Sequence, residues 1–403
     1  MRSRVRHRVR SHPPRGYAGS VRSVQPSNAI VAAVAVSGFV AAFGLWLGLL
    51  ALREERAGDG FDFVRWELTT VANKWLFALG APLRDDPPAD EALVRYFALE
   101  DRAGGAGRRL ENAAEAAIEG RIHAAIRAAG LSAPLPLPGA LAVWPPVDLE
   151  LSGSPRVLVV SPRAEIRRAA ARVLRLDLDP GELLAIEDRT ELEDGSLSAL
   201  VVPTGGIAAY PAIVSNGRSY RTTVSTGAHE WVHHYLAFYP LGRAFFGNAD
   251  ARTINETVAD IVGDGLRDLV IARSGDLAPA APPGGPSGEP PPVDRDAVLR
   301  ALRLEVDELL AAGAIPEAER RMEEVRLQLE EAGVFIRRLN QAHFAWFSIY
   351  AARADAIDPL GLQIIEIRER AGSLGRFMEL VRGVASRAGV EELLAELQAG
   401  ERA

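Results

Sequence analysis

The feature of this sequence that most constrains its fold is the segment HEWVH, which runs from His229 to His233 in a chain of 403 residues. Residues four apart lie on one face of an α-helix, so a helix here aims both imidazoles at a common point. Glu230 lies beside them, about 100° further round the helix. Apart from Glu230, the stretch from Thr226 to Tyr235 contains no Asp, Glu, Lys or Arg. The pattern predicts a buried helix that carries half of a zinc site together with a candidate base.

A second predicted helix, Asn255 to Asp268 (NETVADIVGDGLRD), supplies further candidate ligands. Zinc in a catalytic site takes three protein ligands and keeps a fourth position for water. Glu256, in the first turn of this helix, is the expected third ligand beside His229 and His233. Asp260 lies four residues further on, on the same face, where its carboxylate can accept the second N–H of a ligating histidine. The sequence therefore predicts a Zn²⁺ centre.

The two segments HEWVH and NETVAD resemble the paired motifs of the zincin metallopeptidases, in particular the gluzincin branch to which the thermolysin-like enzymes belong. The resemblance covers only about Thr226 to Asp260. It implies a zincin-like catalytic domain, the ligand set given above, and Glu230 as the general base that activates a zinc-bound water. It also implies that the strand before the first helix, at about Ser219 to Val224, holds a peptide substrate by strand addition.

Other zinc enzymes are excluded by residue type. The metzincin extension requires glycine and histidine at two positions that are Leu236 and Tyr239 in this chain. The chain contains no cysteine, which excludes thiol nucleophiles, disulfides and the cysteine ligand of the peptide deformylases. The polar groups around the motif place it outside a membrane helix, unlike the motif of the intramembrane zinc proteases.

A donor for the developing oxyanion is needed in addition to zinc, and in this class it is commonly a tyrosine or a histidine. Spacing does not choose among the candidates, which are Tyr235, Tyr239, His343 and Tyr350. His234 points away from the metal-facing side of the helix. It is therefore interpreted as a packed or exposed neighbour.

The first 52 residues predict a membrane anchor. Residues 1–28 contain seven arginines and no acidic residue, and residues 29–52 form an apolar run without charge. About 20 residues of helix cross the hydrocarbon core, and the arginines keep the N-terminus in the cytoplasm. A cleavable signal peptide is the alternative, but the run is longer than its apolar region. Gly44 and Gly48 form a GxxxG pair that offers a homodimer contact, although glycine is common in membrane helices.

The expected fold class is α+β, mostly helical, with a small mixed sheet and one transmembrane helix. Within the core we expect a helix at Pro162 to Leu176 and a hairpin turn at Asn216-Gly217. The predicted divisions are a basic cytoplasmic tail (1–28), a transmembrane anchor (29–52), a helical juxtamembrane region (53–146), a zincin-like catalytic core (147–275), a Pro/Gly-rich linker or insertion (276–293), and a helical C-terminal region that closes the cleft (294–403).

The predicted function is that of a single-pass zinc metallopeptidase of the cell membrane, whose catalytic domain lies on the extracytoplasmic side and cleaves peptides or proteins. An endopeptidase is favoured over an aminopeptidase, because PTGGIAAYPAIVS has no acidic residue to hold a substrate amine. The net charge of -7 gives no support to nucleic-acid binding. The alternative is a non-catalytic extracytoplasmic binding or envelope protein that retains a zincin fold.

Overall fold

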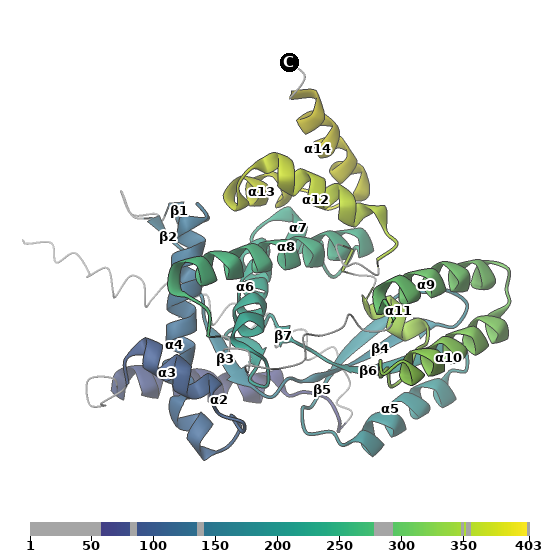
Figure 1. Ribbon diagram of the computed structural model, residues 1–403, viewed down its shortest axis with the longest axis horizontal. Helices are drawn as coiled ribbons and strands as arrows, with labels where there is room; N and C mark the ends of the chain where they lie inside the picture. Colours follow the sequence, from purple (N-terminus) through teal and green to yellow (C-terminus); the bar gives the residue numbers. More distant parts are fainter. Residues whose placement is uncertain are drawn as a thin grey trace, which may run out of the picture. The chain divides into compact units, whose positions relative to one another are not determined.

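The computed structural model (Figure 1) describes residues 58–80, 87–134, 141–277, 293–347, 350–351 and 356–400. Within these ranges, no helix combines the length and the apolar character needed to cross a membrane. The basic tail, the predicted anchor with Gly44 and Gly48, and most of the linker at 276–293 lie outside them. The described residues confirm the α+β, mostly helical class.

Three helices precede the first sheet, within the region at 53–146 that was expected to be helical: α2 (Phe63–Gly80), α3 (Ala89–Phe97) and α4 (Gly105–Ala128). Helix α4 buries Ile118, Ile122 and Ile126, which lie four residues apart on one face, in the largest hydrophobic core. The same core contains the buried faces of the two helices that carry the histidine and NETVAD motifs. The helix is followed by Gly130, whose φ of 76° lies in the left-handed region that glycine adopts without steric cost.

The strands form two separate three-stranded sheets and one short ribbon, instead of the single small sheet expected. The ribbon pairs β1 (Ala133–Pro134) with β2 (Leu141–Ala142). In the first sheet, the order is β3 (Leu149–Ser152), β8 (Ala212–Ser215), β7 (Gly206–Ile207), with β3 parallel and β7 antiparallel to β8. The second sheet is antiparallel, in the order β5 (Ala170–Leu174), β4 (Arg156–Pro162), β6 (Leu197–Pro203).

Two local predictions are wrong. The segment expected as a helix at Pro162 to Leu176 contains β5, because pairing with the buried strand β4 outweighs the helix propensity of its alanines. The predicted hairpin and the strand at Ser219 to Val224 are absent, since Ser219 caps a helix instead, its Oγ accepting from the backbone N–H of Thr222 at 3.3 Å. The Asn216-Gly217 pair lies in the turn between β8 and that helix, α6 (Tyr220–Leu236).

Helix α5 (Pro180–Glu193) precedes β6, and the short helix α7 (Pro240–Arg243) follows α6. After α8 (Ala249–Ser274), the described residues contain helices and no strand. Residues 334–340 are not helical, so α11 begins only at Gln341, and α13 and α14 are separate helices. The C-terminal helices are α9 (Arg295–Ala311), α10 (Ile315–Glu331), α11 (Gln341–Phe347), α12 (Pro359–Ala371), α13 (Leu374–Val381) and α14 (Arg387–Gly400).

These helices pack in two groups. Helices α9 and α10 share a hydrophobic cluster of their own, in which Val306, Met322 and Val325 are buried. Helix α11 packs on β4 and β6 of the second sheet. Helices α12 and α13 pack instead on α8, where Phe377 and Met378 join the largest core.

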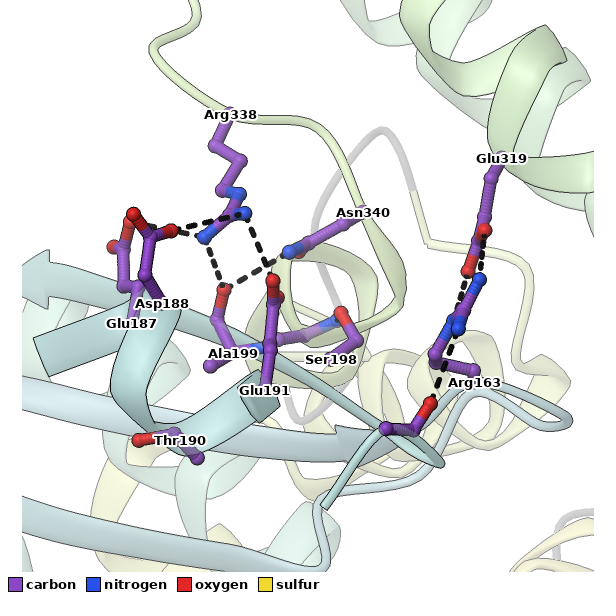
Figure 2. A network of polar contacts seen from close by, with 12 residues as sticks. Arg163, Glu187, Asp188, Thr190, Glu191, Ser198, Ala199, Glu319, Arg338 and Asn340 are labelled. Carbon is purple, nitrogen blue, oxygen red and sulfur yellow. Dashed lines mark hydrogen bonds and ion pairs between the residues drawn. The ribbon is translucent and has the colours of Figure 1, made fainter. Parts of the chain in front are cut away.

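The buried carboxylate of Glu187 fixes the chain segment before α11 on the second sheet. Glu187 of α5 is fully buried and accepts from the backbone N–H of Val201 at 2.6 Å, from Arg337 Nη1 at 2.9 Å and from Arg338 Nη1 at 3.2 Å. Figure 2 shows Arg338 above Glu187, with Asn340 donating to the carbonyl of Ala199 at 2.9 Å. These contacts hold residues 337–340 in a non-helical path, so the helix begins only at α11.

Replacing Glu187 by alanine is expected to lower the free energy of unfolding by about 3 kcal/mol, because two guanidinium groups lose a buried partner. Chemical denaturation followed by circular dichroism measures the change. Glu193→Ala, at the exposed end of the same helix, is the control and is expected to change it by less than about 0.5 kcal/mol. Equal effects of the two substitutions would contradict the role of Glu187.

Candidate metal centre

The centre lies where α6 and α8 pack against each other. A Cβ atom on Gly263 of α8 would lie 3.0 Å from the Ser225 carbonyl oxygen and 3.1 Å from Cβ of His229, so only glycine fits here without displacing α6. Further along, His233 of α6 contacts Asn255 of α8. Since higher numbers on α6 meet lower numbers on α8, the two helices run in opposite directions. This pairing brings the HEWVH and NETVAD segments face to face.

Three ligand atoms converge between the helices. His229 Nε2 lies 3.0 Å from His233 Nε2, and Glu256 Oε2 lies 3.5 Å from the first and 3.6 Å from the second. Tetrahedral nitrogen and oxygen ligands of one zinc ion are themselves separated by about 3.3 Å. The distances and the His, His, Glu donor set therefore fit a zinc ion.

The outer nitrogens of both imidazoles are held by α8. His229 Nδ1 lies 3.0 Å from Asp260 Oδ1, and His233 Nδ1 lies 2.7 Å from Asn255 Oδ1. An oxygen acceptor at Nδ1 places the proton there, which leaves the lone pair of each Nε2 directed at the common point. Asp260 thus lies where it was predicted. Asn255 was not assigned a role from sequence, although it is the first residue of NETVAD.

The electrostatics of the cluster favour a cation. Burial by itself raises the pKa of Glu256, but the imidazoles of His233 and His229 outweigh burial and hold that pKa well below its usual range. Burial lowers the pKa of His229, whereas hydrogen bonds to Asp260 and Glu256 raise it well above its ordinary value. The carboxylates that stabilise a proton on His229 equally stabilise a divalent cation in its place.

Glu230 lies buried between the cluster and the edge strand β7. A Cβ atom on Gly206 of β7 would lie 2.5 Å from Glu230 Oε1, 2.7 Å from Thr226 Cγ2 and 2.9 Å from the Ile213 carbonyl oxygen. Only glycine at this position leaves room for the carboxylate. Burial raises the pKa of Glu230, while the imidazole of His229 opposes the shift. A carboxylate with a raised pKa beside a metal site is suited to accept and return a proton.

Of the four candidate oxyanion donors, Tyr350 is the one that the structure places close to the cluster. The backbone N–H of the next residue, Ala351, donates to Thr257 Oγ1 at 3.2 Å, directly after Glu256 on α8. Burial and the negative charges of Glu256 and Asp260 raise the pKa of Tyr350 well above its ordinary value. Its hydroxyl group therefore stays protonated and can donate a hydrogen bond.

The other candidates have different neighbours. Arg382, the residue after α13, donates from Nη1 to the hydroxyl oxygens of Tyr235 and Tyr239 at 2.8 and 3.0 Å. Both hydroxyl groups therefore point toward this arginine. The ring of His343 packs against Phe344 and Phe347, with centroids 5.7 and 4.8 Å apart.

His234, expected as a packed or exposed neighbour of the ligands, is a core residue. It is buried, and its Nε2 lies 2.7 Å from the carbonyl oxygen of Ala209 in the loop after β7. Burial lowers its pKa to about 4, so the ring is neutral and Nε2 donates to the carbonyl.

A second group of carboxylates, Glu111, Glu115 and Glu150, has a different explanation. Lys74, the one lysine of the chain, extends its ammonium group toward it, 3.5 Å from Glu115 Oε2 and 2.7 Å from Asp148 Oδ1. Glu115 Oε1 also accepts from a backbone N–H of β3 at 2.7 Å. These carboxylates tie α2 and α4 to β3, and no histidine joins them, so His229, His233 and Glu256 form the stronger metal candidate.

A cavity of about 460 Å³ lies beside the N-terminal part of α8. It is lined by residues of α8, α9 and α11 and by charged side chains such as Asp358 and Arg387, which pair with each other at 2.5 Å. None of the candidate ligands lines this cavity. The case for a metal centre accordingly comes from the convergent side chains and not from the size of a pocket.

Three comparisons with known proteins return no match: no family model, no curated protein and no solved structure is significantly similar to the chain. The gluzincin resemblance therefore remains a prediction carried by two motifs.

Removing the side chain of Asn255 is expected to lower the affinity for zinc about 10- to 100-fold, because His233 loses the acceptor that fixes its ring. Competition with a zinc chelator measures the affinity of Asn255→Ala against the unchanged protein. Thr253→Ala is the matched control, since Thr253 lies on the same helix but lines the cavity. An unchanged affinity in Asn255→Ala would contradict this account of the site.

Proposed function

We propose that the protein is a membrane-anchored zinc metallopeptidase of the zincin type that hydrolyses peptide bonds. The observation that carries the proposal is the convergence of His229 Nε2, His233 Nε2 and Glu256 Oε2 within 3.6 Å of one another. The membrane anchor and the extracytoplasmic position are inferred from the sequence of residues 1–52.

A bound zinc ion would supply a Lewis acid and a coordinated water whose pKa falls toward ~7. Glu230 would accept a proton from a water that attacks the peptide carbonyl and would return a proton to the departing amine. The hydroxyl group of Tyr350 donates to the developing oxyanion. Asp260 and Asn255 keep the two imidazoles in the required orientation throughout.

Strand β7 is the proposed substrate edge, in place of the segment at Ser219 to Val224. Among the described residues it is the outer strand of its sheet, since it pairs there with β8 alone. Gly206 of β7 adjoins the carboxylate of Glu230, so a peptide added to this edge passes beside the base. An edge that binds extended backbone suits internal cleavage, which agrees with the preference for an endopeptidase.

The buried position of Glu230 favours catalysis over the non-catalytic alternative. Burying a carboxylate costs free energy. A site that only binds metal does not need Glu230, because His229, His233 and Glu256 already supply three ligands. Glu230 is nevertheless directed to the metal side of α6, and Gly206 leaves room for it.

Substituting Glu230 by glutamine is expected to lower kcat about 10²- to 10⁴-fold with zinc content unchanged, because the amide cannot take the proton. Atomic emission measures the zinc, and cleavage of a peptide library measures activity. His229→Ala is the matched variant and is expected to lose both zinc and activity. Bound zinc with undiminished cleavage in Glu230→Gln would refute the mechanism. Full zinc occupancy without cleavage of any peptide by the unchanged protein would establish the non-catalytic alternative.

Substituting Tyr350 by phenylalanine is expected to lower kcat about 10²-fold with little change in KM, because the hydroxyl group acts on the oxyanion and not on the bound substrate. Steady-state kinetics on one peptide gives both constants. Tyr235→Phe serves for comparison, since that hydroxyl group accepts from Arg382. Unaltered kcat in Tyr350→Phe would assign the oxyanion to another donor.

A further inference from the structure

Two arginines, Arg168 and Arg252, lie close to the candidate centre without an evident function in it. Arg168 belongs to the loop between β4 and β5, and Arg252 belongs to the first turns of α8. Both side chains are partly buried. Each guanidinium group stacks on an aromatic ring, Arg168 on Trp346 at 5.8 Å and Arg252 on Phe245 at 5.9 Å.

Neither arginine is neutralised within the part of the chain that the structure describes. Other partly buried arginines bind carboxylates at short distance: Arg163 Nε lies 2.6 Å from Glu319 Oε1, and Arg321 Nε lies 2.8 Å from Glu305 Oε1. Arg168 and Arg252 have no carboxylate within ion-pair distance among these residues, and the buried Nε of Arg252 has no hydrogen-bond partner. Such donors are costly to bury unless a ligand satisfies them.

Both groups lie beside the metal ligands. Arg252 precedes Glu256 by one helical turn on the same face of α8. The ring of Phe245, on which Arg252 stacks, lies 5.9 Å from the ring of His233. Burial and the positive charge of Arg252 lower the pKa of Arg168 to about 10, while Glu256 and Tyr350 oppose the shift. The two cations therefore repel each other next to a carboxylate that is already shared by two imidazoles.

We propose that Arg168 and Arg252 form a subsite that binds a carboxylate of the peptide substrate next to the scissile bond. A planar guanidinium group binds a carboxylate through two parallel hydrogen bonds, and a carboxylate between the two arginines removes their mutual repulsion. The bound group is either the free C-terminus of the peptide or an acidic side chain. The inference rests on the proposed peptidase function for the identity of the ligand. The existence of an anion subsite can be measured without turnover.

Calorimetric titration of the full-length protein, with its metal as purified, uses succinate as the carboxylate probe and succinamide as its neutral counterpart. We expect succinate to bind and succinamide not to bind, and we expect Arg168→Gln and Arg252→Gln each to weaken succinate binding at least about 10-fold. Two exposed arginines provide matched controls with unchanged binding: Arg167→Gln, in the same loop, and Arg273→Gln, on the same helix. Failure of succinate to bind, or equal binding by all variants, would overturn the subsite.

Hydrolysis then identifies the source of the carboxylate. One pair of peptides differs in a free or amidated C-terminus, and a second pair has glutamate or glutamine next to the cleaved bond. We expect the unchanged protein to prefer the acid in one pair, and the ratio of kcat/KM between acid and amide to fall at least about 10-fold in Arg168→Gln and Arg252→Gln. A ratio unaffected by both variants would refute recognition of a substrate carboxylate. Succinate binding without any hydrolysis would leave the subsite standing and refute the peptidase function.

Discussion

The close packing of α6 against α8 at Gly263 determines where the groups of the candidate centre lie. With no side chain at this position, the backbones approach until a Cβ atom would lie only 3.0 Å from the Ser225 carbonyl oxygen. Two turns along α8 from Gly263, on the same face, stands Glu256, and one turn along α6 from His229 stands His233. A wider separation of the helices would move the carboxylate away from both imidazoles at once. The geometry of the ligands thus depends on a packing contact outside the centre.

The charged groups of the candidate centre favour a bound cation. Glu256, Glu230 and Asp260 bring three carboxylates to two imidazoles, and Glu256 and Glu230 are almost fully buried. If both rings are neutral, as metal ligands must be, the three carboxylates outnumber the two nearby guanidinium groups of Arg168 and Arg252, so a net negative charge remains in a region of low polarity. Protons on the histidines are one way to offset it, and a divalent ion is the other. The convergence of both Nε2 atoms with Glu256 Oε2 favours the ion, since it places three donors around one point.

The sequence predicted the part of the site that depends on helical periodicity. His229 with His233, and Glu256 with Asp260, share a face because each pair is four residues apart, whatever the rest of the chain does. Strand β5 and the helical start of α6 were missed, because strand pairing and capping outweighed local propensity there. The sequence did not single out Tyr350 among the four candidate donors. The hydrogen bond that places it near the cluster joins Ala351 to Thr257, which are 94 positions apart in the sequence.

Two of the groups proposed to act on the substrate, Tyr350 and Arg168, lie in segments without a recognisable sequence motif. Tyr350 is held near the centre because the backbone N–H of Ala351 donates to Thr257, and the preceding chain is fixed to the second sheet through Glu187 and its two arginines. That sheet also carries the loop of Arg168, whose guanidinium group stacks on Trp346 of α11. One scaffold, the second sheet with α11, therefore positions both the proposed oxyanion donor and half of the proposed carboxylate subsite. Helices α6 and α8 carry the candidate metal ligands and the candidate base, so the proposed recognition and bond cleavage would depend on how firmly the two parts are joined at α8.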